Sequence, residues 1–122
     1  MIIGTTTIGE STNTMGLEII SLELSDAGFT VENVDKTNAK DVDILMVSLY
    51  WIDQVLRYPQ WLCDAKINPA EKKPLIIIGG SMAFNMYPLI DMFHYAVLGD
   101  GENIAVEMAR LIERGEFAKL ET

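Results

Sequence analysis

Short apolar runs alternate with amphipathic segments along the chain. Two of these runs, Leu75–Ile78 and Tyr95–Leu98, lie about twenty residues apart, and glycine follows each of them directly. Continuous apolar strands that end in glycine turns are typical of a parallel sheet with both faces covered. Ligands of such sheets bind beyond the carboxyl ends of the strands, where glycine allows a close approach of backbone. The pattern therefore predicts an α/β domain with a ligand edge.

The rest of the pattern predicts three more strands and the helices that connect them. We expect strands at Met1–Thr5, around Phe29–Val34 and at Asp43–Leu49, and the last of these is apolar enough to be central. Apolar spacings of three and four residues indicate the helices. The first is expected at Leu17–Ala27 and ends at Gly28, and the second runs from a first turn at Pro59 to about Ile67. A short third helix is expected at Asn85–Met92. The last helix ends at Gly115 and carries Ile104, Met108 and Leu111 on one face.

Five strands that alternate with helices through right-handed crossovers form a doubly wound parallel sheet with helices on both faces. At this chain length the flavodoxin-like strand order 2-1-3-4-5 is expected, and its switch point lies between the first and third strands. We expect a single domain over residues 1–122. The loops expected at its ligand edge are Thr5–Thr14, Ser48–Asp53, Gly79–Asn85 and Gly99–Glu102.

Charge and cysteine content narrow the range of binding partners and cell compartments that we expect. The chain has 18 acidic and 9 basic residues, and its net charge of −9 argues against nucleic acid and anionic membranes, which bind basic surfaces. The first residues do not form a signal peptide, and no apolar stretch approaches the length that spans a membrane. The lone cysteine, Cys63, cannot form a disulfide within the chain, which fits a cytoplasmic setting, and we expect its thiol to pack within a helix.

The expected ligand edge is rich in hydroxyl groups and poor in acid–base chemistry. It carries threonines and serines together with two aromatic residues, Tyr50 and Trp51. The single histidine, His94, precedes the fifth strand at the opposite edge of the sheet, so a structural contact is the favoured interpretation over a metal ligand. No catalytic motif is present, and the edge suits holding a flat ligand with polar margins better than acid–base catalysis.

The two glycine turns also carry a family resemblance. An apolar strand, Gly79–Gly80, a spacer, a second apolar strand and then Gly99–Asp100–Gly101–Glu102 resemble the N-terminal cobalamin-binding domain of radical S-adenosylmethionine (SAM) enzymes. Ser48–Leu49 is similar to the Ser-x-Leu element of cobalamin domains, and the likeness is clearest over Asp43–Arg114. The resemblance implies a cofactor site of fourteen residues. These are Thr5, Thr6, Thr7, Ser48, Leu49, Tyr50, Trp51, Gly79, Gly80, Ser81, Gly99, Asp100, Gly101 and Glu102.

Two departures from the family pattern limit what the chain does alone. The Asp-x-His-x-x-Gly motif that supplies a histidine to cobalt is replaced by Thr5–Thr14, so no protein ligand to cobalt and no metal site is expected. The Cys-x-x-x-Cys-x-x-Cys motif of the catalytic domain is missing, so this chain holds no iron–sulfur cluster. The resemblance therefore implies a non-catalytic accessory domain whose partner is a radical SAM catalytic domain, in the same longer chain or in a separate subunit.

Two alternatives stay open from the sequence. The same fold can act as a docking or structural domain without a cofactor. It can also bind flavin mononucleotide (FMN), because the Thr5–Thr14 segment is similar to the hydroxyl-rich phosphate loop of flavodoxins, with Tyr50 and Trp51 as stacking rings. A Gly80→Val substitution is expected to block the cofactor edge and leave the sheet folded.

Overall fold

A computed structural model of the chain describes residues 1–8, 15–49, 52–71, 73–80, 87–97 and 102–115. Five parallel strands form one sheet in the order β2-β1-β3-β4-β5, which confirms the flavodoxin-like prediction. The strands are β1 (Ile2–Thr7), β2 (Thr30–Asn33), β3 (Ile44–Ser48), β4 (Leu75–Gly79) and β5 (Tyr95–Ala96).

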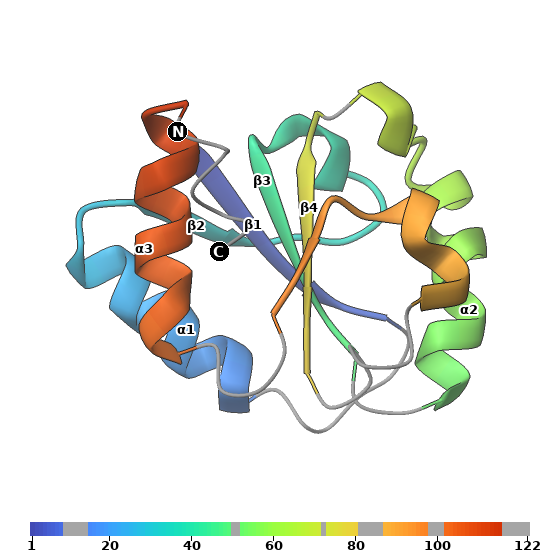
Figure 1. Cartoon of the computed structure of the whole chain (residues 1–122), viewed down its shortest axis with the longest axis horizontal. Helices are drawn as coiled ribbons and strands as arrows, with labels where there is room; N and C mark the ends of the chain where they lie inside the picture. Colours follow the sequence, from blue (N-terminus) through green and yellow to red (C-terminus); the bar gives the residue numbers. More distant parts are fainter. Residues whose placement is uncertain (9–14, 50–51, 72, 81–86, 98–101, 116–122) are drawn as a thin grey trace.

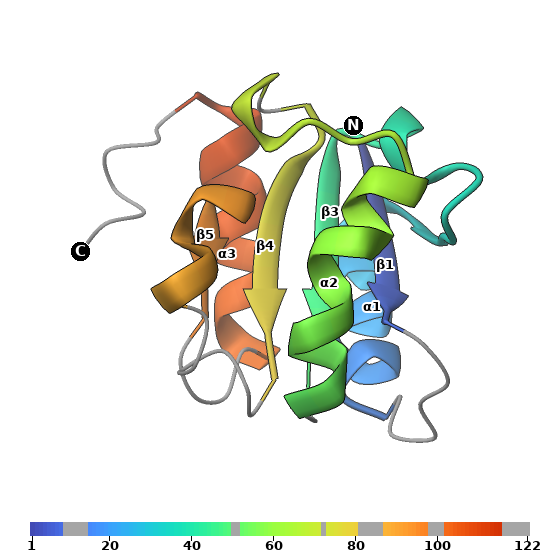
Figure 2. The same cartoon turned by 90° about the vertical axis from the view of Figure 1, so that its right-hand side faces the viewer.

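Helices cover both faces of the sheet (Figures 1 and 2). On one face α1 and α3 pack against each other, and α2 covers the other face. Short 3₁₀ helices lie in the connections, among them η4, which replaces the predicted helix at Asn85–Met92 over its described part. The helices are α1 (Met15–Asp26), α2 (Ile52–Asp64), α3 (Glu102–Glu113), η1 (Ala39–Asp41), η2 (Pro69–Glu71) and η4 (Tyr87–Met92).

The central strands are apolar because both of their faces are buried. Side chains alternate along each strand, so Met46 of β3 packs on the α1/α3 side, whereas its neighbours Leu45 and Val47 pack on the α2 side. In β4, Ile77 and Ile78 divide between the two cores in the same way. This arrangement confirms the sheet with two covered faces that the continuous apolar runs predicted.

Helix α1 ends as its sequence predicts. Gly28 adopts a φ of +98°, a conformation that favours glycine, and the amide of Phe29 donates to the carbonyl of Leu24 at 3.0 Å. The buried face of α3 agrees with the prediction at Met108, which is buried, and Leu111 is half-buried. It differs at Ile104, whose side chain is 41% exposed, because Ala105 and Ala109 are buried instead. The two alanines, four residues apart, lie in the core against the sheet, and Ile104 turns outward beside them.

Helix α2 begins seven residues before the predicted first turn. It starts at Ile52, so Pro59 lies inside the helix rather than at its start. Proline removes one hydrogen bond from a helix interior, and the burial of Tyr58 and Trp61 on the inner face offsets this loss. Cys63 is exposed, so the prediction that its thiol packs within the helix is wrong.

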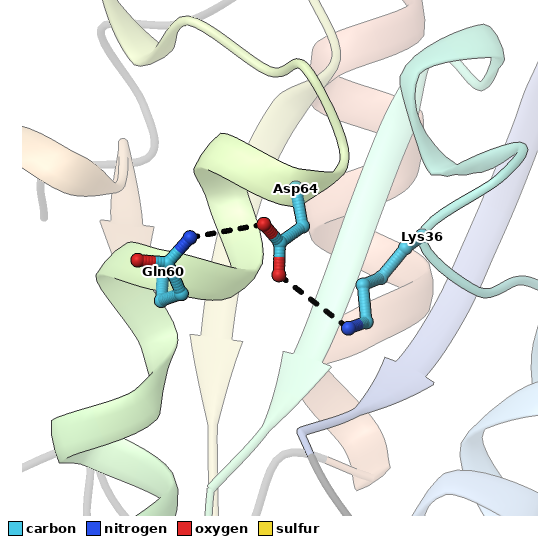
Figure 3. A network of polar contacts seen from close by, with 3 residues as sticks. All are labelled: Lys36, Gln60 and Asp64. Atoms are coloured by element: carbon cyan, nitrogen blue, oxygen red, sulfur yellow. Dashed lines mark hydrogen bonds and ion pairs between the residues drawn. The ribbon is translucent and has the colours of Figure 1, made fainter.

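A small polar network connects the last turn of α2 to the segment after β2 (Figure 3). Asp64 accepts a hydrogen bond from the Gln60 side chain at 2.9 Å, and its other carboxylate oxygen lies 3.5 Å from the Lys36 ammonium. The hydrogen bond from Gln60, and after it the charge of Lys36, lower the pKa of Asp64 below its usual value. These side chains are exposed, so the ion pair contributes little to stability.

The segment before β5 is held by two side chains. His94 accepts a hydrogen bond from the Ile76 amide at Nδ1, 2.7 Å away, and its Nε2 lies 2.7 Å from the carbonyl oxygen of Pro69. An accepting Nδ1 places the proton on Nε2, which donates to that carbonyl. The Tyr58 hydroxyl donates to the Met92 carbonyl at 2.6 Å. Both ring nitrogens of His94 are therefore used structurally, in agreement with the favoured interpretation of this residue.

Candidate functional site

Three small residues form a row at the carboxyl edge of the sheet. Thr7 ends β1 and pairs with Ser48, which ends β3, and Ser48 pairs with Gly79, which ends β4. Ile3, Met46 and Ile77 pack on the α1/α3 side, so alternation puts all three row positions on that side as well. Two hydroxyl groups and a bare backbone thus lie next to one another at the switch point of the fold. We call Thr7, Ser48 and Gly79 the edge row.

The strand residues two positions before the edge row are buried. Two residues earlier, Thr5 of β1 pairs with Met46, and Met46 pairs with Ile77 of β4. Each of these three side chains is buried. Ser48 of the edge row is buried as well, whereas Thr7 and Gly79 are half-buried. A ligand at the carboxyl edge would therefore meet Thr7 and Gly79 first.

The structure changes the interpretation of three predicted site residues. Thr5 and Thr6 lie inside β1 and are buried, so the predicted loop from Thr5 is wrong at its start. Strand β1 lies between β2 and β3, and pairing on both sides extends it to Thr7. The Leu49 side chain is fully buried in the core on the α2 side, so only its backbone can border the edge.

The two glycines at the end of β4 have different surroundings. Gly80 has a φ of +96°, and a Cβ there would lie 3.0 Å from the backbone nitrogen and carbonyl carbon of Leu49 and closer still to its carbonyl oxygen. A Cβ on Gly79 would have no heavy atom of the described residues within 4 Å. Gly80 is therefore needed for close backbone packing, and Gly79 leaves space at the edge.

A buried side-chain amide joins the end of β1 to the start of α2 at the switch point. Gln54, in the first turn of α2, is 2% exposed, and its Nε2 donates to the carbonyl oxygen of Ile8 at 3.0 Å. Ile8 directly follows β1, and α2 follows β3 in the chain. Sequence reasoning missed this residue, although a polar side chain beside Val55 on the inner face of a helix was a usable signal.

A groove of about 490 Å³ opens on the α1/α3 side, between α1 and the strands β1 and β2. Its volume is within the range of small-molecule sites. Five of its nine lining residues carry a hydroxyl group and Glu18 of α1 adds a carboxylate, although more of the exposed lining is apolar than polar. The lining residues are Thr5, Thr6, Thr7, Glu18, Ser21, Leu22, Ser25, Val31 and Asn33. Through Thr7 the groove is continuous with the edge row.

Several predicted site residues fall outside the part that the structure describes. These are Tyr50, Trp51, Ser81, Gly99, Asp100 and Gly101, while Glu102 begins α3. Within the described residues, no group of three or more histidine, cysteine or acidic side chains could hold a metal ion. None of the described helices is long and apolar enough to cross a membrane.

Comparison with protein families adds a finding that the geometry alone does not give. The model of the N-terminal region of radical SAM proteins matches residues 20–121. The chain belongs to this family. Within this radical SAM N-terminal region the match includes Ser48 and Gly79, whereas Thr7 precedes it. A search of curated proteins gave no match.

Proposed function

We propose that this radical SAM N-terminal domain, acting as one unit over residues 1–122, holds cobalamin at the carboxyl edge of its sheet. The observation that carries the proposal is the edge row, in which two hydroxyl-bearing residues and an open glycine line up on one side of three paired strands. Open glycine and small hydroxyl residues allow a large planar ligand to approach the backbone closely.

The residues present fit such a ligand in three respects. Thr7 and Ser48 would offer hydrogen bonds to polar margins of the cofactor, and Gly79 would let its flat face come near. The adjoining groove, lined by Ser21, Ser25 and other polar side chains, would take a polar extension of the cofactor. When bound, cobalamin supplies radical or group-transfer chemistry at cobalt. This chain would bind and orient the cofactor for a radical SAM catalytic domain and would not catalyse the reaction by itself.

A cytoplasmic setting belongs to the same proposal. Cys63 is exposed and unpaired, and a reducing compartment keeps such a thiol from oxidising. The net charge of −9 disfavours nucleic acid as a competing partner.

Exposed apolar residues favour a second function, docking of a catalytic domain without a cofactor. Ile52 and Leu56 are 58% and 75% exposed, and their spacing of four residues places them on one face of α2. Helix α2 begins near the carboxyl edge, so this apolar pair lies close to that end of the sheet, on the α2 side. Apolar side chains exposed at this level are typical of surfaces that meet another protein.

Titration of the purified chain with hydroxocobalamin, with FMN in parallel, tests these functions. Absorbance and calorimetry should show saturable binding of cobalamin and none of FMN. Ser48→Ala and Thr7→Val should each weaken binding about 2- to 12-fold, the equivalent of one hydrogen bond. Gly79→Val should abolish it at an unchanged melting temperature.

Thr30→Val is the matched control, because Thr30 is an exposed threonine at the opposite end of the strands. Its affinity for cobalamin should equal that of the wild type. Binding of FMN alone would favour the flavodoxin-like alternative, and binding of neither ligand would favour the docking function. Saturable cobalamin binding that none of the three edge-row substitutions weakens would place the site elsewhere.

A further inference from the structure

Gln54 connects two chain segments that are adjacent at the switch point and distant in sequence. Its side chain is nearly inaccessible, and it bonds the carbonyl of Ile8, 46 residues earlier. The inner face of α2 otherwise buries Val55, Tyr58, Trp61 and Leu62. A polar amide among these side chains loses its hydration, so its hydrogen bonds must compensate for that loss.

The effect of this bond on the edge row follows from where the bond lies. Ile8 is the residue after Thr7, the first member of the edge row, and its own side chain is 1% exposed in the core on the α2 side. Gln54 lies on the helix that follows Ser48, the second member of the row. The bond therefore fixes how the chain leaves β1 relative to the start of α2, on the α2 side of the edge.

We propose that Gln54 is a positioning residue that holds the β1 and β3 ends of the edge row in the arrangement that receives the ligand. For ligand affinity this inference rests on the proposed function. Without the bond, the Ile8 carbonyl loses the side-chain donor that the described residues give it, or the chain after Thr7 shifts outward to hydrate it. If the receiving arrangement is then present only a tenth of the time, the apparent affinity falls tenfold.

The side chain has to be an amide of this length for the bond to form. Methionine has a similar length and an apolar end, so Gln54→Met keeps the packing and removes the donor. Glutamate has the same shape, but its ionised carboxylate only accepts hydrogen bonds, so Gln54→Glu sets an acceptor against the Ile8 carbonyl. Gln60→Met is the matched control on the same helix, because Gln60 is exposed and bonds Asp64.

The first measurement is hydroxocobalamin affinity at a temperature where circular dichroism shows every variant folded. Gln54→Met should bind about tenfold more weakly or worse, Gln54→Glu still more weakly, and Gln60→Met like the wild type. A residue with a purely structural role would lower the melting temperature and leave the affinity of the folded protein unchanged. Wild-type affinity in folded Gln54→Met would overturn the inference.

The second measurement needs no cofactor and separates the two proposals. Amide hydrogen exchange of the free protein should be faster at Ile8 and Leu49 in Gln54→Met than in the wild type and in Gln60→Met. If the wild type binds no cobalamin while this exchange pattern appears, the cofactor proposal fails and the positioning role at the edge stands. Unchanged exchange at both residues would overturn the positioning role, whatever the cofactor result.

Discussion

Gly80→Ala is the substitution whose cost the structure defines most directly. A φ of +96° costs an L-residue about 1–2 kcal/mol relative to glycine. The added Cβ would also meet the Leu49 backbone at 3.0 Å or less, and backbone cannot rotate away as a side chain does. Leu49 is held in place by its amide, which donates to the Gly79 carbonyl at 2.9 Å, and loss of that bond adds about 1 kcal/mol.

These contributions predict that Gly80→Ala lowers the free energy of unfolding by about 2–3 kcal/mol. For a chain of this size the melting temperature should fall by roughly 8–12 °C. Thermal and urea unfolding followed by circular dichroism measure both quantities. The sequence-based expectation that Gly80→Val blocks the edge and leaves the sheet folded stays a prediction. The structure adds a cost in stability to it, because the first atom added to Gly80 already meets the Leu49 backbone.

Gly79→Ala is the matched control for this reasoning. It adds the same atom one residue earlier, where the described residues leave 4 Å of free space, so stability should change by less than about 0.5 kcal/mol. Equal losses at the two glycines would refute the argument, since the Leu49 contact exists only at Gly80. The restriction that alanine places on the unfolded chain acts in the opposite direction, because it stabilises the folded state.

Three further outcomes are expected from side-chain contacts. His94→Phe removes the acceptor of the Ile76 amide and should lower the free energy of unfolding in urea by about 1–3 kcal/mol. A loss below about 0.5 kcal/mol would show that water accepts this hydrogen bond in place of the ring nitrogen. Tyr58→Phe should cost about 1 kcal/mol at pH 7, because it removes the bond to Met92. Burial raises the pKa of Tyr58, so the stability that it contributes is present below about pH 10 and lost as the pH rises further. Urea unfolding between pH 8 and 11 should therefore show a shallower decline in Tyr58→Phe than in the wild type. The pKa of Asp64 is lowered, first by the hydrogen bond from Gln60, so its contribution is present above about pH 4 and lost as the pH falls. Carboxyl titration by NMR should show that pKa rising in Gln60→Ala, and an unchanged value would contradict the assigned cause.

The fold was predictable because the strands carry a strong and repeated signal. Strands buried on both faces carry continuous apolar runs, and residues 44–47 of β3 and 75–78 of β4 form such runs. The helix boundaries were less predictable, since proline favours a first turn only as a tendency, and the buried inner face of α2 overrides it at Pro59. Ile104 shows the same effect, because two alanines in place of bulky side chains determine which face of α3 meets the sheet.

The site was predictable in part. Thr7, Ser48 and Gly79 were predicted individually, but their row depends on strand register, which turns on where β1 ends. The sequence placed that end at Thr5, two residues too early. The bond from Gln54 to Ile8 joins residues 46 positions apart and becomes visible only when both elements are placed.

The contacts at the carboxyl edge separate stability from ligand access. On the α2 side the edge is closed by the packing of Gly80 against the Leu49 backbone and by the bond from Gln54 to Ile8. On the α1/α3 side, Gly79 leaves free space among the described residues, and the groove beside α1 adjoins the row through Thr7. For the proposed ligand, the described residues therefore favour an approach from the α1/α3 side. Substitutions that close that side should weaken binding in a folded protein, whereas those on the α2 side should act on the fold or on the arrangement of the edge. Each class of variant thus has its own readout, so a loss of binding can be assigned to one side of the sheet.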